Sequence, residues 1–187
     1  MRRYLFLLLV VACSIKATFA QTEEMKFVGI PMNQTQSSFI SALKQKGFTD
    51  NVNQLKWNFE GYNCITLAGS FWKFDDCEIR VKYSIATDSV ASVAVRKQFF
   101  SIWNKKLYEL MDNLDLKYGK RICTRDDINN SEYRWISKDP FGMVEVSWVL
   151  MKNVQLDLFM IEYFTSNETR KTIGKEIVDK KAELDEL

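Results

Sequence analysis

Strict alternation of apolar and polar residues in one segment constrains the fold of this chain most. In CEIRVKYSI, residues 77–85, apolar side chains occupy every second position: Ile79, Val81, Tyr83 and Ile85. Alternation of this kind places the apolar side chains on one face of a strand and the polar ones on the other. One buried and one solvated face is typical of antiparallel sheets. The segment therefore predicts a strand in an antiparallel sheet that is covered on one side.

Five further segments have the composition of strands. They span residues 57–73, 89–98, 132–137, 143–151 and 154–163. Turn-forming residues separate neighbours at FDD (74–76), ATD (86–88) and KN (152–153), which predicts short hairpin connections. We expect an antiparallel sheet of about six strands.

The segment TQSSFISALKQKGF, residues 35–48, has the signals of an amphipathic helix. Thr35 can cap its first turn, and Gly47 can take the left-handed conformation that ends a helix. Apolar side chains recur between them at helical spacing, at Phe39, Ile40 and Leu43. This pattern predicts a helix packed on the sheet.

A second helix is predicted over residues 101–117 and a third from about Asn167. The second carries an apolar stripe at Trp103, Leu107, Leu110, Met111 and Leu114. We expect an α+β fold in which the two main helices pack on one face of the sheet and a C-terminal helix follows. The prediction is a single domain over residues 21–187. Two α-βββ halves, about residues 25–98 and 99–187, are the alternative interpretation.

The chain opens with the features of a secretory signal peptide. Arg2 and Arg3 precede an apolar run that is too short to span a bilayer. Small residues at Thr18 and Ala20 form a cleavage site before Gln21. We therefore predict a signal peptide at residues 1–20 and a periplasmic or secreted protein. VVAC at residues 10–13 also resembles a lipobox, so a lipid anchor on Cys13 stays an open alternative. No later apolar run predicts a membrane span.

Removal of the leader changes the net charge. The whole chain has 26 basic and 24 acidic residues, and residues 1–20 hold three of the basic ones and no acid. The remainder has 23 basic and 24 acidic residues, which gives a net charge of −1. This balance argues against nucleic acid as a partner.

Three cysteines remain after the leader, an odd number for an oxidising compartment. Cys77 shares strand parity with Ile79, whereas Cys64 shares it with Thr66 on the opposite face. We therefore predict that Cys77 is buried and not bonded to Cys64. Whether Cys123 pairs with either of them stays open.

The chain lacks the residues of the commonest catalytic systems. It has no His, which removes the usual general base and the Ser-His and Cys-His nucleophile systems. It has no C-x-x-C, Walker or G-x-G-x-x-G motif. The adjacent acids Asp75–Asp76 and Asp126–Asp127 are interpreted as solvated loop residues. We predict no catalytic, cofactor-binding or metal-binding residue and no cofactor, and we favour a protein that is not an enzyme.

Aromatic residues near the first strand are the candidate binding patch. Trp57, Phe59, Tyr62 and Trp72 could lie together on the sheet face away from the helices. Contiguous exposed aromatic side chains usually mark binding sites. The alternative is that these four residues cover the core.

Several segments together resemble a family of uncharacterised exported proteins from Bacteroides-like bacteria. They are FVGIPMNQTQSSFISALKQKGF, LAGSFWKFDDCEIRV, FSIWNKKLYELMDNLDLKYGK and VQLDLFMIEYFTSN. The positions that match its pattern are Gly29, Ile30, Pro31, Lys46, Gly47, Phe48, Gly69, Phe71, Cys77, Trp103, Tyr108, Lys117, Tyr118, Gly119 and Tyr163. The chain departs from the pattern at Phe164, where relatives carry Asp. The resemblance implies a periplasmic α+β fold and no known activity or functional residue.

The sequence favours a non-enzymatic binding or interaction module whose partner is a protein, peptide or glycan of the cell envelope. A histidine-free carboxylate hydrolase is the first alternative, and it needs two acids that converge with perturbed pKa values. An inhibitor-like or structural envelope protein is the second alternative.

Overall fold

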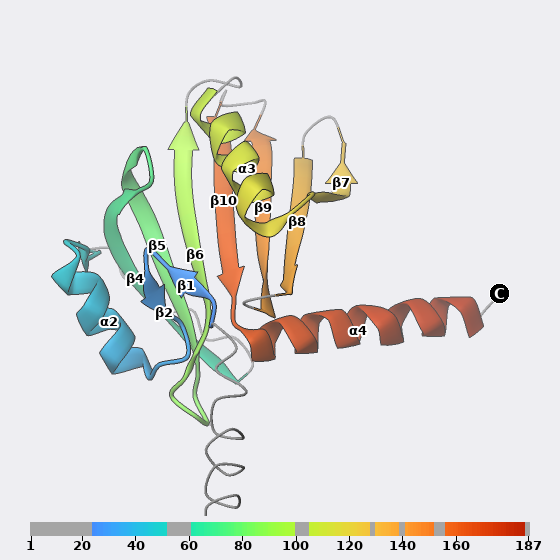
Figure 1. Cartoon of the computed structure of the whole chain (residues 1–187), viewed down its shortest axis with the longest axis horizontal. Coiled ribbons are helices and arrows are strands. Elements are labelled where there is room, and N and C mark those ends of the chain that lie inside the picture. The colour runs from blue at the N-terminus through green and yellow to red at the C-terminus, as the bar shows by residue number, and fades with distance from the viewer. Residues whose placement is uncertain are drawn as a thin grey trace, which may run out of the picture.

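An eight-stranded antiparallel sheet is the centre of the molecule (Figure 1). The computed structural model describes residues 24–51, 61–99, 105–127, 130–138, 141–151 and 156–185. Across the sheet the order is β3 (Thr49–Asp50), β4 (Tyr62–Phe71), β5 (Phe74–Ser84), β6 (Val90–Phe99), β10 (Leu156–Phe164), β9 (Phe141–Met151), β8 (Asn130–Lys138) and β7 (Ile122–Asp126). A small two-stranded sheet, β1 (Lys26–Phe27) with β2 (Ile30–Pro31), lies beside it.

Two runs of consecutive strands meet at the middle of the main sheet. β4, β5 and β6 form one antiparallel run, and β7, β8, β9 and β10 form the other. The last strands of the two runs, β6 and β10, pair with each other from Ser92↔Phe164 to Phe99↔Asp157. Each run is preceded by a helix, so the chain builds the sheet from its two edges toward the centre.

The expected antiparallel α+β architecture is confirmed, but the prediction of about six strands is wrong. The two additional strands are β3 and β7, at the edges of the sheet. β3 has two residues and β7 has five, and all of them are exposed. Such short, exposed strands carry no apolar alternation, so their sequence resembles that of a loop. They become strands because β4 and β8 offer them a free edge to pair with.

The strand register divides the side chains between two faces of the sheet. One row of directly paired residues is apolar and forms the core face: Leu67, Ile79, Val95, Ile161, Val146 and Tyr133. The neighbouring row is mostly charged and defines the outer face: Thr66, Arg80, Ala94, Glu162, Glu145 and Arg134. The alternation predicted for β5 is confirmed at Ile79 and Val81, which are fully buried. It is wrong at Ile85, which is 57% exposed because β5 ends one residue earlier.

Helix α2 (Gln36–Gln45) follows the sequence prediction closely. The backbone N–H of Ser38 donates to Thr35 Oγ1 at the N-terminus. At the C-terminus Gly47 has a φ of +92°, and the Phe48 N–H donates to the Leu43 carbonyl. This is the glycine-ended motif in which the residue after the glycine folds back onto the last turn.

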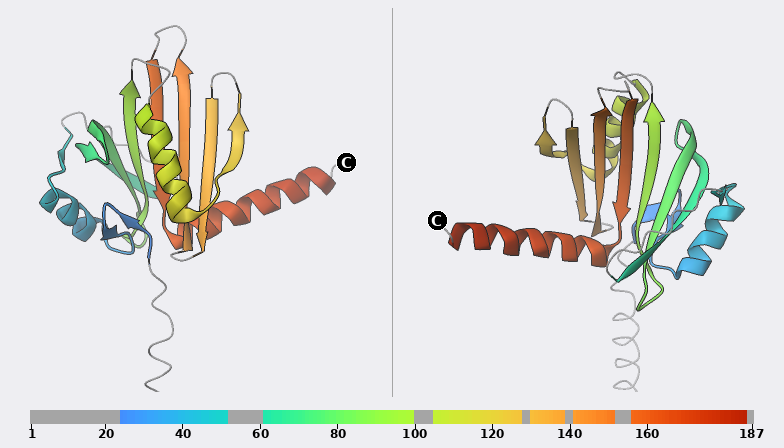
Figure 2. Two further views of the ribbon diagram at one scale, coloured as in Figure 1. Left: turned by 45° about the horizontal axis from the view of Figure 1, so that its top comes forward. Right: turned by 180° about the vertical axis from the view of Figure 1, so that it is seen from behind.

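Helix α3 (Lys105–Tyr118) buries Leu107, Leu110, Met111 and Leu114, as predicted. Trp103, the first residue of the predicted stripe, lies outside the described residues. The buried side chains of α2 and α3 belong to the same apolar cluster as the core-face residues of the sheet. Figure 2 shows α2 beside β4 and β5 and α3 in front of the β8–β10 part of the sheet.

Helix α4 (Ser166–Asp185) lies against β9, β10 and β6 at one end of the sheet. Its C-terminal part extends beyond the strands (Figure 1). None of the described helices combines the length and the apolar character that crossing a membrane requires.

The β4–β5 hairpin turns two residues earlier than the sequence suggests. Phe71 pairs with Phe74, so the turn consists of Trp72 and Lys73 instead of residues 74–76. Trp72 has a φ of +52°, a conformation that is uncommon for a large side chain. Trp and Lys are not typical turn residues, whereas Asp75 and Asp76 are, and this misled the prediction.

The cysteine prediction is confirmed on the points that the structure describes. Cys77 is 1% exposed, and Cys64, Cys77 and Cys123 are all free thiols. Cys77 pairs with Gly69 and Cys64 pairs with Lys82, so the two lie on opposite faces and at different levels of the hairpin. Cys123 lies exposed on β7, at the far edge of the sheet.

Candidate binding site

The two described members of the predicted aromatic patch lie at opposite ends of β4. Tyr62 is the first residue of the strand, and Trp72 directly follows its last residue. Trp57 and Phe59 lie outside the described residues. Tyr62 and Trp72 therefore do not form a contiguous patch with each other, and the four-residue patch stays a prediction.

Tyr62 is engaged by helix α4. Its hydroxyl donates to Glu168 Oε1 at 2.9 Å and accepts from Lys171 Nζ at 2.8 Å. The hydrogen bond from Lys171 to Tyr62 raises the pKa of Lys171, so the amine stays charged. A charged amine cannot accept a proton, and these contacts instead fasten α4 to the start of β4.

A different group of aromatic side chains comes together in the other half of the sheet, on β8 and β9 beneath α3. Tyr108 of α3, Tyr133 of β8 and Trp148 of β9 form what we call the surface aromatic cluster. The ring centroids of Tyr108 and Trp148 are 6.2 Å apart at an interplanar angle of 75°. Those of Tyr133 and Trp148 are 6.1 Å apart at 50°. Offset and edge-on pairs in this distance range attract each other through their ring quadrupoles.

Strand parity gives two of these residues their position. Tyr133 pairs with Val146, and Trp148 pairs with Phe159, so both side chains leave the sheet on its core face. Both are partly buried against the core. Tyr108 reaches them from α3 and is 41% exposed. The cluster thus packs on the edge of the core with its inner side. Its outer side leaves part of the Tyr108 ring accessible to solvent.

Arg121 completes the cluster and is held in place by two acids. Its guanidinium lies 5.8 Å from the centroid of the Tyr133 ring, within the range of a cation–π contact. Asp115 accepts from Arg121 Nη2 at 2.8 Å, and Asp112 accepts from it at 3.1 Å. Asp115 also accepts a hydrogen bond from Trp135 Nε1 at 2.8 Å. Because Trp135 is fully buried, this network ties the orientation of Arg121 to the core.

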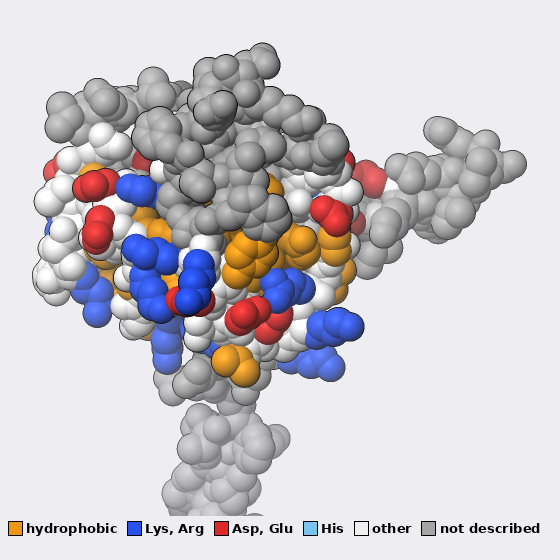
Figure 3. All heavy atoms as spheres, turned by 90° about the horizontal axis from the view of Figure 1, so that it is seen from above, with side chains coloured by type: hydrophobic (Ala, Val, Ile, Leu, Met, Phe, Trp, Pro, Cys, Tyr) orange, Lys and Arg blue, Asp and Glu red, His pale blue; other side chains and the backbone are white. Residues whose placement is uncertain are grey.

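The electrostatics of the cluster favour a neutral or mixed-charge ligand. Burial raises the pKa of the Tyr133 phenol, with Asp126 and Cys123 adding to the shift, so Tyr133 remains a hydrogen-bond donor at neutral pH. Arg121 is compensated by its two aspartates. Seen from above, hydrophobic side chains lie beside both basic and acidic ones on the described surface (Figure 3). Within the described part of the chain no group of His, Cys, Asp and Glu side chains could hold a metal ion.

A pair of glutamates on the outer face is a second chemical feature. Glu162 of β10 and Glu145 of β9 are directly paired residues, and their side chains leave the same face. Arg134 donates to Glu145 at 2.7 Å and to Glu176 of α4 at 2.8 Å. Ser92 donates to Glu162 Oε1. Burial raises the pKa of Glu162, and the negative charges of Glu145 and Glu168 raise it further. The two paired acids therefore lie in different surroundings: Glu162 is largely buried and accepts from Ser92, whereas Glu145 is bound by Arg134.

The acids named in the sequence analysis do not take part in this pair. Asp126 accepts from Ser131 at 3.1 Å, and Asp127 accepts from Arg125 at 2.9 Å, both near the β7–β8 connection. Asp75 accepts from Ser70 at 3.0 Å. The four adjacent acids are exposed, in line with their interpretation as solvated residues, but Asp75, Asp76 and Asp126 lie in strands and not in loops.

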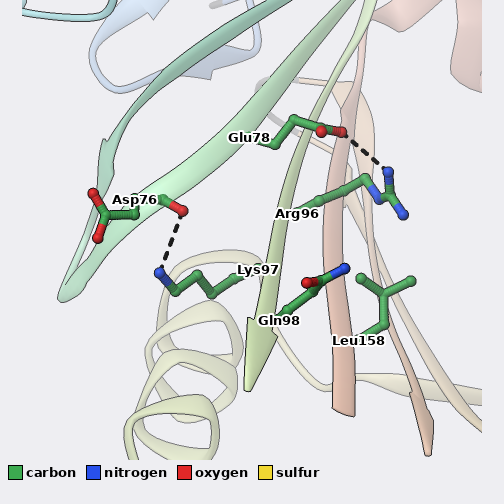
Figure 4. Close-up of a pocket in the computed structure, with 6 residues that line it drawn as sticks. All are labelled: Asp76, Glu78, Arg96, Lys97, Gln98 and Leu158. Atoms are coloured by element: carbon green, nitrogen blue, oxygen red, sulfur yellow. Dashed lines mark hydrogen bonds and ion pairs between the residues drawn. The ribbon is translucent and has the colours of Figure 1, made fainter. Parts of the chain in front are cut away.

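The outer face also carries a pocket of about 350 Å³ (Figure 4). Asp76, Glu78, Arg96, Lys97, Gln98 and Leu158 line it. Glu78 accepts from Arg96 at 3.1 Å and from Arg80 at 2.6 Å, and Lys97 Nζ donates to the backbone carbonyls of Asp75 and Asp76. The charges of Glu78 and Arg96 are thus paired with each other within the protein.

The sequence analysis did not point to the surface aromatic cluster, because a sequence does not show which distant segments come together. Tyr133 and Trp148 have the parity of core residues, and Tyr108 is adjacent to the buried stripe of α3. Only Tyr133 lies on a strand that pairs with an edge strand, and that edge strand, β7, was not predicted.

Comparisons with known proteins add no relative. No family model matches the chain, and no curated protein or solved structure shows significant similarity to it. The resemblance to exported proteins of Bacteroides-like bacteria therefore stays a prediction, and the function has to be argued from the geometry of the site.

Proposed function

We propose that this chain is an exported, non-enzymatic binding protein that contacts a protein, peptide or glycan of the cell envelope through the surface aromatic cluster. The observation that carries the proposal is the convergence of Tyr108, Tyr133 and Trp148 from three elements, with Tyr108 left 41% exposed. Tyrosine and tryptophan are favoured at binding sites because they offer large apolar area with few rotatable bonds and a polar group at the end.

Two further features support this proposal. The leader sequence at residues 1–20 has the pattern of a secretory signal, which supports export to the periplasm or beyond. We also infer that α2 and α3 cover the core face together. The aromatic cluster would then lie at the border of the part of β8 and β9 that α3 covers, where a partner can reach it.

Binding assays with matched variants test the proposal. We would screen the mature protein against arrays of peptides and of oligosaccharides, and repeat the screen with Tyr108→Ala. Leu116→Ala is the control, because Leu116 lies on the same helix, is 87% exposed and is not a member of the cluster. We expect Tyr108→Ala to weaken binding at least about tenfold, in line with an interface aromatic, and Leu116→Ala to leave it unchanged. Equal effects of the two variants would contradict the proposal.

A histidine-free carboxylate hydrolase is the second candidate function. The glutamate pair favours it, because burial raises the pKa of Glu162 while the neighbouring Glu145 is bound by Arg134, so two carboxylates in different environments lie side by side. A panel of chromogenic glycosides and esters tests this candidate with the unchanged protein, Glu162→Gln and Glu145→Gln. Turnover that is lost in both variants would establish it. Absence of turnover across the panel, or turnover unchanged in the variants, would exclude the pair as its catalytic site.

A further inference from the structure

Helix α4 holds its first two acids against the sheet. Tyr62 of β4 donates to Glu168 Oε1 at 2.9 Å, and Arg134 of β8 donates to Glu176 Oε2 at 2.8 Å. Residues at this spacing share one side of a helix. The negative charges of the two acids are therefore engaged within the protein.

The solvent-facing side of the same turns is basic. Between Ser166 and Glu176 the exposed residues include Arg170, Lys171 and Lys175 and no acid. Lys171 Nζ donates to the hydroxyl of Tyr62, and its side chain remains 63% exposed. The next exposed acid of the helix is Asp179, one turn beyond Lys175. The first turns of α4 therefore present positive charge to the surroundings.

Lys138 extends this positive charge beyond the helix. It is the last residue of β8, is exposed and pairs with Phe141. The Arg170 guanidinium lies 5.2 Å from the centroid of the Phe141 ring. We call Lys138, Arg170, Lys171 and Lys175 the basic end surface. Figure 1 shows α4 crossing the lower end of the strands, so this surface forms one end of the molecule.

The N-terminal part of the chain enters the fold at this same end. A Cβ at Gly142 would clash with the Met25 side chain and lie 3.1 Å from the Phe164 carbonyl oxygen, so Met25 lies near the start of α4. A lipid on Cys13, the open alternative for the leader, would be eleven residues from Glu24. A chain of that length reaches at most about 40 Å. Such an anchor would keep the basic end surface close to a membrane.

An exposed apolar side chain at this end favours a bilayer over a soluble acidic chain. Ile85 is 57% exposed, and its N–H donates to the carbonyl of Gly61, the neighbour of the α4-bound Tyr62. A membrane interface attracts Lys and Arg to anionic headgroups and also accepts apolar side chains, whereas a soluble polyanion offers charge alone. Asp88, in the connection that follows Ile85, is an exposed acid and limits the basic area on that side.

We propose that the basic end surface rests on the anionic headgroups of a lipid bilayer, with α4 parallel to the membrane plane. Clusters of about four to eight Lys and Arg bind acidic lipid surfaces in this way. The inference goes beyond the proposed function and does not depend on it. Trp148 of the surface aromatic cluster is five residues from Met143, the residue of β9 that pairs with Phe164, which is about 17 Å along the strand. The cluster therefore stays free for its own partner.

Vesicle binding by the protein from residue 21 onward tests the proposal. The probes are vesicles of phosphatidylcholine alone and vesicles of equal parts phosphatidylcholine and phosphatidylglycerol. We expect sedimentation with the second kind only, and less of it as the salt concentration rises. The double variant Arg170→Gln, Lys175→Gln should bind at least about tenfold more weakly, because each basic residue near an acidic membrane adds to the attraction.

The control is the double variant Lys46→Gln, Lys105→Gln. It removes the same charge from exposed positions after α2 and at the start of α3, and it should bind within about twofold of the unchanged protein. Ile85→Ser should weaken binding to the acidic vesicles and leave any binding to soluble polyglutamate unchanged. With a paramagnetic lipid in the vesicles, the amide signals of residues 166–176 should lose the most intensity.

The outcomes separate this inference from the proposed function. Binding only to acidic vesicles, lost in the α4 variant and kept in the control, supports it. Absence of binding to acidic vesicles, equal binding to both kinds of vesicle or equal loss in the two double variants overturns it. If Tyr108→Ala abolishes vesicle binding, the membrane contact lies at the surface aromatic cluster and the inference is wrong. If polyglutamate binds as tightly as the vesicles and Ile85→Ser has no effect, the partner is an acidic polypeptide and the inference is also wrong.

Discussion

Two aromatic clusters with similar distances between their rings have opposite relations to solvent. The inner cluster consists of Phe27, Phe48, Phe71 and Tyr163, with ring centroids 5.6–6.3 Å apart. Its members are between 0 and 7% exposed. The surface aromatic cluster has centroid separations of 6.1 and 6.2 Å, yet Tyr108 is 41% exposed. Ring contacts alone therefore do not separate a structural cluster from a candidate binding site.

The difference between the clusters lies in what covers them. Phe27 comes from β1, and Phe48 from the turn that follows α2, so segments outside the main sheet close over Phe71 and Tyr163. Tyr108, in contrast, is itself the outermost residue of its cluster. Burial turns aromatic area into stability, whereas exposure leaves it free for a partner. The following predictions test this contrast, from the largest expected effect to the smallest.

Truncation in the inner cluster should have the largest effect. Phe27 packs against its aromatic neighbours and has 0% of its surface accessible to solvent. Phe27→Ala should lower the free energy of unfolding by about 3–5 kcal/mol, because it removes buried area and leaves a cavity. Urea denaturation of the two proteins measures this difference. A loss below that of Tyr108→Ala would show that the inner cluster is not the structural one.

A small addition at Gly69 should disturb the same cluster. A Cβ at this position would lie 2.4 Å from the Phe48 ring, so the ring would have to move. We expect Gly69→Ala to lower the free energy of unfolding by about 1–3 kcal/mol, the usual cost of overpacking. Gly174→Ala is the control, because nothing lies within 4 Å of a Cβ there. The two variants should differ in thermal denaturation, and equal melting temperatures would contradict the close packing of Phe48 on β4.

Alkaline pH should destabilise the protein through the inner cluster. Burial raises the pKa of Tyr163 far above its ordinary value. The unfolded chain then ionises Tyr163 near pH 10 while the folded protein does not, so stability is present below pH 10 and is lost as the pH rises above it. At pH 11 this costs about 1.4 kcal/mol, from the free energy of one pKa unit. Tyr163→Phe should remove that loss and leave stability at pH 7 nearly unchanged. Unfolding curves at pH 7 and pH 11 measure the difference, and parallel pH dependence of the two proteins would contradict the burial of the hydroxyl.

Truncation in the surface aromatic cluster should affect stability least. Tyr108→Ala removes a side chain that is 41% exposed and should change the free energy of unfolding by about 0.5 kcal/mol or less. The same variant should lose binding in the assays described above. Urea denaturation beside the binding measurement checks both expectations. A stability loss comparable to that of Phe27→Ala would mean that both clusters are structural.

The sequence by itself determined the regular elements and their parity. The cap at Thr35, the glycine end of α2, the stripe Leu107–Leu114 and the opposite faces of Cys64 and Cys77 all follow from local spacing, because helix and strand periods fix which side chains share a face. These features depend on neighbours along the chain. They could be predicted before any contact between distant segments was known.

Only the tertiary structure decided the edge strands, the pairing of β6 with β10 and the position of the candidate site. β7 has no apolar alternation and is a strand because β8 offers it an edge. Glu145 and Glu162 are paired because β9 and β10 form a hairpin in one particular register. Tyr108, Tyr133 and Trp148 lie 25 and 15 residues apart in the chain, and they meet because α3 lies across β8 and β9. Contacts between distant segments depend on how the elements pack, and strand periodicity carries no information about that packing.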